Sequence, residues 1–136
     1  MNQAELRTPQ DFSKAALAFS PVASNSAQNG ASIDRTGYRS AIADVAFSCS
    51  GSPTGGLLTL KWQDSADGTT FADFGAAVTA AIPASGGAIA SIPVHLGGAR
   101  KYIRLVSQGA PTGGTSPVVS AAATLRLYGP DNLPAA

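Results

Sequence analysis

The sequence predicts an all-β fold, a β-sandwich, and three observations support this prediction. Several segments alternate apolar and polar residues with a period of two, which is the pattern of a strand that buries one face. Segments rich in glycine, proline and serine separate these strands at short intervals. No segment shows a sustained helical period. About eight short antiparallel strands with this spacing are typical of a jelly roll, although the strand order does not follow from the sequence.

The strongest strand signal lies in Leu57–Phe74. Every second residue from Leu58 to Trp62 is apolar, and the residues between them are polar. Asp67-Gly68 then favours a tight hairpin turn, because this dipeptide tolerates the positive φ angles that such turns need. We therefore predict a return strand at Thr70–Phe74.

The same alternation predicts the other strands, and glycine- and proline-rich segments predict the loops. The predicted strands are Ala15–Val22, Ala31–Asp34, Ser40–Ser50, Ala76–Ile82, Ala88–Leu96, Lys101–Ser107 and Val118–Tyr128. The predicted loops are Ser24–Gly30, Gly51–Gly56 and Gly109–Pro117. Because Pro93 cannot donate a ladder hydrogen bond, its strand should lie at a sheet edge or carry a bulge.

Alternation also predicts which side chains form the core. The predicted inward residues are Ala41, Ala43, Val45, Phe47, Cys49, Leu58, Leu60, Trp62, Ile92, Val94, Leu96, Ile103, Leu105, Val119, Ala121, Ala123, Leu125 and Leu127. Many of them are alanines, so we expect the two sheets to pack closely in places. Phe47, Trp62, Phe71 and Phe74 should fill the wider parts.

The chain of 136 residues is most simply one domain with an extended arm at each end. Residues 1–13 are polar and aperiodic and form the predicted N-terminal arm, residues 14–129 form the β-sandwich, and residues 130–136 form a polar tail. The first residues lack the basic and apolar regions of a signal peptide, so we expect synthesis in the cytosol.

Charged residues make up only 12% of the chain, about half the usual ~25%. A surface of hydroxyls and small side chains suits a protein that packs against neighbours. The net charge of +1 predicts no general attraction to nucleic acid or to a membrane surface, and no apolar run approaches the ~20 residues of a membrane span. Cys49, the single cysteine, excludes an internal disulfide and should pack as a small apolar residue.

Titratable groups that could converge on an active site are scarce, so we predict no enzyme, metal or cofactor. His95 is the single histidine, and no serine lies in a GxSxG motif. Asp64, Asp67 and Gly68 faintly resemble a calcium loop but lack its ligand spacing, so a hairpin turn is the favoured interpretation. Glu5, the single glutamate, lies in the predicted arm.

Arg100, Lys101 and Arg104, with Tyr102 between them, form a small basic cluster. Three charges neutralise only a few phosphates, and no stacking platform accompanies them. A salt-bridged or interfacial face is therefore the favoured interpretation, rather than a nucleic-acid site.

Three segments in this order resemble small structural proteins of tailed bacteriophages. They are Ile33–Tyr38 (IDRTGY), Leu60–Phe71 (LKWQDSADGTTF) and Arg100–Leu105 (RKYIRL), followed by a late strand that ends in Gly129-Pro130. The resemblance spans about residues 30–130 and is to the decoration or cement proteins of phage heads. Each segment alone is a turn or strand signature, and Lys101 interrupts an arginine–tyrosine pair.

The resemblance implies a non-enzymatic protein on the capsid exterior of a virion, made in the host bacterial cytoplasm. It would bind the major capsid protein and bridge its subunits, and it would associate with itself as a homodimer or homotrimer. The residues predicted to form protein interfaces are Leu6, Arg7, Phe12, Tyr38, Arg39, Arg100, Tyr102 and Arg104.

Two alternative functions stay open at this point. One is another part of the virion, such as a tail or neck component. The other is a carbohydrate-binding β-sandwich, for which Tyr38 and Tyr102 would be the platforms because Trp62 is predicted to face the core.

Overall fold

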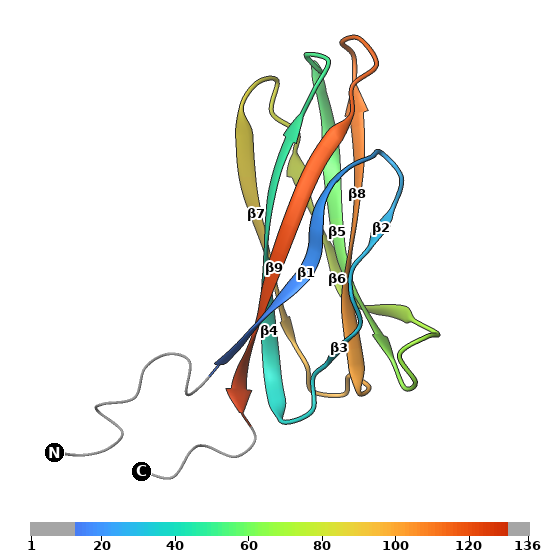
Figure 1. Cartoon of the computed structure of the whole chain (residues 1–136), viewed down its shortest axis with the longest axis vertical. Helices are drawn as coiled ribbons and strands as arrows, with labels where there is room; N and C mark the ends of the chain where they lie inside the picture. Colours follow the sequence, from blue (N-terminus) through green and yellow to red (C-terminus); the bar gives the residue numbers. More distant parts are fainter. Residues whose placement is uncertain (1–12, 131–136) are drawn as a thin grey trace, which may run out of the picture.

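The computed structural model describes residues 13–130, which form two antiparallel sheets packed face to face (Figure 1). Sheet A has the order β1-β9-β4-β7, and sheet B has the order β2-β8-β5-β6, with β3 also paired to β8. The strands are β1 (Ser13–Ala23), β2 (Gln28–Asn29), β3 (Ile33–Asp34), β4 (Tyr38–Cys49), β5 (Gly55–Ser65), β6 (Ala72–Ala81), β7 (Gly87–His95), β8 (Tyr102–Thr112) and β9 (Val119–Pro130). This arrangement confirms the predicted all-β sandwich.

The strand order is that of a jelly roll when β2 and β3 are counted as one interrupted strand. The first strand then pairs with the last, and the pairing continues inward: β1 with β9, β2 and β3 with β8, β4 with β7, and β5 with β6. Such nested pairing is a long antiparallel hairpin wound into two sheets. Pairing between β4 and β9 completes sheet A, and pairing between β5 and β8 completes the four-strand path of sheet B.

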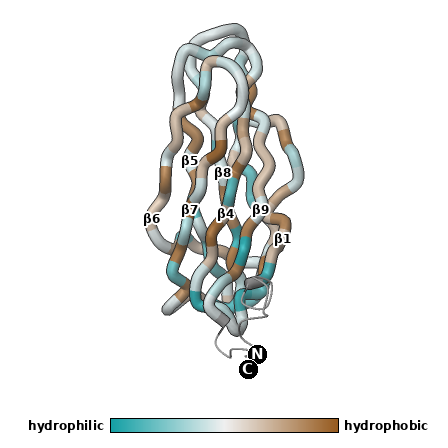
Figure 2. The backbone as a smooth tube through the Cα atoms, turned by 90° about the vertical axis from the view of Figure 1, so that its left-hand side faces the viewer, coloured by the Kyte–Doolittle hydropathy of each residue, from teal (hydrophilic) through white to brown (hydrophobic). Residues whose placement is uncertain are grey.

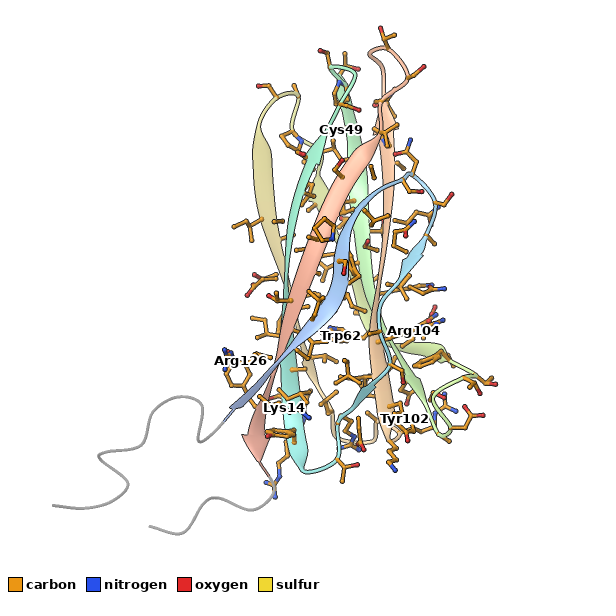
Figure 3. All side chains as sticks on the ribbon, viewed as in Figure 1. Lys14, Cys49, Trp62, Tyr102, Arg104 and Arg126 are labelled. Atoms are coloured by element: carbon orange, nitrogen blue, oxygen red, sulfur yellow. The ribbon has the colours of Figure 1, made fainter. Side chains whose placement is uncertain are left out.

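The core lies between the two inner faces and follows the alternation of the sequence. The predicted inward residues that are buried are Ala41, Ala43, Val45, Phe47, Leu58, Leu60, Trp62, Ile92, Leu96, Ile103, Leu105, Val119, Ala121, Ala123, Leu125 and Leu127. Trp62 lies between the sheets (Figure 3), and its indole N–H donates to the carbonyl of Ile92 at 3.3 Å. Cys49 and Val94 are half-buried against this core.

Several strand boundaries differ from the prediction because pairing partners override local composition. Gln28–Asn29, predicted as loop, pairs with Ser107 and Val106 of β8. The first residues of the predicted loop Gly109–Pro117 continue β8 and pair with β5 as far as Thr112. Similarly, β5 begins at Gly55, inside the predicted loop Gly51–Gly56. Residues of weak strand propensity are strands here because a neighbouring strand offers hydrogen bonds.

The central hairpin is longer than predicted. Residues 66–71 connect β5 to β6 in place of a two-residue turn. The predicted return strand Thr70–Phe74 and the predicted strand Ala76–Ile82 form one strand, β6, with a register shift opposite Leu60–Trp62. Gly75, with φ of 77°, lies at this bulge. The prediction that Phe71 fills the core is wrong: Phe71 is half-buried beneath Arg104 on the outer side of sheet B.

Other predictions about the outline of the domain are confirmed or lie outside the described residues. Pro93 is in β7, an edge strand of sheet A, as predicted. The predicted strand Ala15–Val22 is β1, and Ser13, assigned to the N-terminal arm, is its first residue. Residues 1–12 and 131–136, which make up most of the predicted arm and tail, lie outside the described residues.

Candidate protein-interaction surfaces

The three segments that carry the phage resemblance meet at one end of the sandwich. Because β3 and β5 both flank β8, Asp34 and Ser65 each pair with Tyr102. We call this the motif end and define it as Ile33–Tyr38, Ser65–Phe71 and Arg100–Leu105. It is the lower end in Figure 1, from which both ends of the described chain also leave.

Arg35 holds two loops of the motif end together. Its Nε donates to the Arg100 carbonyl at 3.2 Å, its Nη1 donates to the Tyr38 carbonyl at 3.2 Å, and its Nη2 donates to the Ala99 carbonyl. Its backbone N–H donates to the Lys101 carbonyl at 2.9 Å. Arg35 therefore joins the β3–β4 turn to the β7–β8 loop, a role that the sequence pattern did not reveal.

Arg100 forms an ion pair with Asp64 at the end of β5. The Arg100 Nη2 lies 3.0 Å from Asp64 Oδ1 and also donates to the Asp64 carbonyl at 2.8 Å, while the Arg100 backbone N–H donates to Oδ2 at 3.0 Å. Burial raises the pKa of Asp64, but the hydrogen bonds and charge of Arg100 outweigh this effect, and the pKa is lowered overall. The salt-bridged interpretation of Arg100 is confirmed.

Asp67 organises the β5–β6 hairpin. Its Oδ1 accepts hydrogen bonds from the backbone N–H groups of Thr69 at 2.9 Å and Thr70 at 3.0 Å, and from the Ser65 hydroxyl at 2.8 Å. These donors lower the pKa of the Asp67 carboxyl. The Asp67 carboxylate thus takes the place of a backbone carbonyl as the acceptor for the N–H groups of the turn. Gly68 takes the positive φ of 81° that the turn requires.

Arg104 is engaged on the outer face of sheet B. Its Nε donates to Gln63 Oε1 at 2.8 Å, and its guanidinium lies 4.1 Å from the centre of the Phe71 ring. Gln63 in turn donates to Asp73 at 2.8 Å, and Lys61 pairs with Asp73 at 3.1 Å. This polar network fixes the side chains of the face and satisfies their hydrogen bonds.

The structure brings the described residues of the predicted interface to the motif end. Tyr38 and Tyr102 are half-buried, and Lys101 Nζ lies 5.3 Å from the Tyr102 ring centre. Arg39 is exposed next to Tyr38 at the start of β4. Figure 3 shows Tyr102 and Arg104 in the lower half of the molecule. The predicted residues Leu6, Arg7 and Phe12 lie outside the described residues.

The structure places His95 against the backbone. Its Nδ1 lies 3.0 Å from the Arg39 carbonyl and 3.2 Å from the Gly97 nitrogen. Within residues 13–130, no group of three or more histidine, cysteine or acidic side chains is arranged to hold a metal ion. The same described residues contain no helix long and apolar enough to cross a membrane.

Among residues 13–130, charged side chains are confined to one half of the sandwich, which sequence reasoning did not detect. Four stretches contain no Asp, Glu, Lys or Arg, and together they build the half that lies away from the two ends of the described chain: residues 17–30, 45–60, 76–92 and 105–123. We call this the uncharged half. Most strongly hydrophilic residues lie toward the opposite end (Figure 2). The four stretches are visible in the sequence, but only the jelly-roll order shows that they lie side by side.

An apolar groove crosses the outer face of sheet A within the uncharged half. It is lined by Pro21, Ala46, Ser48, Ile89, Ser120 and Ala122. Ile89 is 75% exposed on β7, and Leu17 is 55% exposed on β1. Small side chains on the two central strands thus lie between two large exposed aliphatic residues on the edge strands. This face contrasts with the polar network of sheet B.

Comparisons with known proteins show a likeness of fold. No family model matches the chain, and no curated protein matches its sequence. Among solved structures, it is similar to the crystal structure of PBSX exported protein XepA, with a TM-score of 0.53 and 19% sequence identity over 90% of this chain. The chain spans 39% of the length of XepA, and the likeness shows the fold alone.

Proposed function

We propose that this chain is a non-enzymatic structural protein of a tailed-phage virion that binds the outer surface of the capsid and bridges major capsid protein subunits. One observation carries this proposal: the three segments that resemble decoration proteins converge on the end of the fold from which both ends of the described chain leave. That XepA, the neighbour in fold, is an exported protein of the phage PBSX supports a phage component in general.

The motif end is suited to attachment because side-chain contacts hold its loops together and two basic side chains are exposed beside them. Arg35 and the Asp64–Arg100 pair fix its loops, while Arg39 and Lys101 stay exposed at its rim. Both ends of the described chain leave the sandwich at the motif end, so we expect residues 1–12 and 131–136 to contribute to attachment. Repeated over a shell, modest contacts at each copy give strong attachment through avidity.

Co-sedimentation with purified capsid shells tests the proposal. Removing residues 1–12 should weaken attachment while the β domain stays folded by circular dichroism. Lys101→Glu should lower the affinity about tenfold, because it reverses a charge at the motif end. Thr115→Glu adds a charge at the opposite end and serves as the control. Full attachment of both the truncated chain and Lys101→Glu would contradict the proposal.

No observation on the described residues favours the carbohydrate-binding alternative. Trp62 is 1% exposed, and Tyr38 and Tyr102, the two platforms expected for this alternative, are both half-buried. A tail or neck location would be recognised by imaging, because such parts are present in far fewer copies than the capsid subunits.

A further inference from the structure

Four basic residues lie around the motif end, and we call them the basic rim. They are Lys14 at the start of β1, Arg35 in the β3–β4 turn, Arg39 at the start of β4 and Lys101 just before β8. Lys14, Arg39 and Lys101 are exposed. The Arg35 guanidinium donates to three backbone carbonyls, which hold it in place without neutralising its charge.

Asp34 is the acidic residue that lies among these four cations. Its Oδ1 accepts a hydrogen bond from the Thr36 backbone N–H at 2.9 Å. Hydrogen bonds from Thr36 lower the pKa of Asp34, and the charges of Lys101 and Lys14 lower it further. Both lysines therefore act on the same carboxylate, although they belong to opposite sheets. One exposed carboxylate leaves most of the positive charge of the basic rim without an acidic counterpart.

The other charged residues of the described chain are balanced in number on each sheet. At sheet B there are three basic and three acidic residues, and at sheet A one of each: Lys61, Arg100 and Arg104 with Asp64, Asp67 and Asp73, and Arg126 with Asp44. Residues 13–130 hold eight basic and five acidic residues, a net charge of +3, and this excess lies at the basic rim. The value of +1 for the whole chain does not show it.

We propose that the basic rim docks on an acidic protein surface, where aspartate and glutamate carboxylates of the partner face Lys14, Arg39 and Lys101. This inference rests on the function proposed above and adds the chemistry of the partner surface. Opposite charges across an interface speed association and fix the orientation of the partners. The uncharged half offers no such attraction, so the motif end approaches the partner first.

Charge complementarity favours a protein surface over a nucleic acid. The three exposed cations could neutralise only a few phosphates, which gives weak binding at ordinary salt concentrations. Half-buried Tyr38 and Tyr102 lie beside them, and tyrosine is enriched in protein interfaces. The basic rim therefore has the composition of a protein contact that includes ion pairs.

Co-sedimentation of the full chain with purified capsid shells, repeated over a range of salt concentrations, tests the inference. Raising the salt from about 50 mM to about 500 mM should lower the affinity about tenfold, because salt screens exposed charges. At low salt, Lys101→Gln and Lys14→Gln should each lower the affinity about fivefold. Lys61→Gln is the matched control: it removes the same charge from the exposed pair with Asp73 on sheet B, and the affinity should stay within about twofold.

The outcomes separate this inference from the capsid proposal. Attachment that does not respond to salt, or equal losses in Lys101→Gln and Lys61→Gln, would overturn the acidic partner surface and leave the capsid proposal intact. No attachment at any salt concentration would overturn both. Attachment that disappears after nuclease treatment of the shells would assign the basic rim to a nucleic acid instead.

A double-mutant comparison in the full chain excludes the acidic residues of the N-terminal segment as the partner. With Glu5→Gln and Asp11→Asn present, Lys101→Gln should cause the same loss of affinity as it does alone. Disappearance of that loss would show that Lys101 acts on the chain's own acidic residues, which would overturn the inference. Thermal melting of each variant distinguishes lost attachment from lost folding.

Discussion

Single residues fix the motif end, and Asp64 is the best example. This residue is buried, yet its pKa is lowered because Arg100 supplies both a charge and two hydrogen-bond donors. The three basic residues that are close together in the sequence therefore have different surroundings in the fold. Arg100 pairs with Asp64, Arg104 stacks on Phe71, and Lys101 remains exposed.

The lowered pKa of Asp64 predicts a loss of stability in acid. A carboxyl whose pKa is lower in the folded state than its ordinary value of 3.8 stabilises the fold fully above that value, and the contribution is lost as the pH falls through the lowered pKa. We expect the melting temperature to be steady at neutral pH and to fall below about pH 4. Asp64→Asn should melt lower at pH 7 and show a shallower fall in acid.

Asp73→Asn is the control for this prediction, because the Lys61–Asp73 pair is solvent-exposed and such pairs contribute little. If the acid transition of Asp64→Asn were as steep as that of the unmodified chain, the assigned role of Asp64 would be wrong.

Sequence patterns identified the residues of this end but not their partners. Arg100, Tyr102 and Tyr38 could be selected because they lie in recognisable segments. Arg35 was seen only as part of a turn, since its three acceptors are backbone carbonyls of residues 38, 99 and 100. A contact between distant segments leaves no periodic signal in the chain, so only the fold reveals it.

At the scale of strands, the hairpin between β5 and β6 depends on one carboxylate. Asp67→Ala removes the acceptor for the backbone N–H groups of Thr69 and Thr70. We expect faster hydrogen exchange at these two amides and little change in the central strands, because the hairpin lies outside the core. Asp67→Asn keeps an acceptor oxygen and should retain most of the protection. Unchanged exchange in the alanine variant would contradict this role.

The packing of β8 against β9 depends on the absence of a side chain at Gly109. A Cβ at this position would lie 2.5 Å from a methyl carbon of Val119, so Gly109→Ala should destabilise the fold by about 1–3 kcal/mol. Val119→Ala removes the two methyl carbons but keeps the Cβ, which would lie 2.8 Å from the added Cβ, so it relieves part of the clash. The double variant should therefore lose less stability than the two single changes added together. Urea denaturation measures all three, and strict additivity would show that the clash is not the cause.

The sequence predicted the strands well where alternation was long. It predicted them poorly where a segment is a strand only because a neighbouring strand pairs with it. The inward residues of β4, β5 and β9 follow directly from their period of two. By contrast, β2 exists because β8 has an unpaired edge beside it, and Gly109–Thr112 is a strand because β5 pairs with it. Local composition carries no information about such partners.

The whole molecule has two dissimilar halves. The motif end holds both ends of the described chain and the interlocked loops, while the uncharged half holds the apolar groove that Ile89 lines on sheet A. The low charge of the chain was evident from its composition, but its distribution required the strand order, which a sequence does not define. The two halves therefore present different chemistry to other proteins.

Electron cryo-microscopy of phage particles is the decisive measurement for attachment to the capsid. We expect the β-sandwich at regularly repeated positions over the capsid exterior, with the motif end against the major capsid protein and the uncharged half farther from the shell. Particles that lack this chain on the shell, or that carry it only in the tail, would contradict attachment to the capsid.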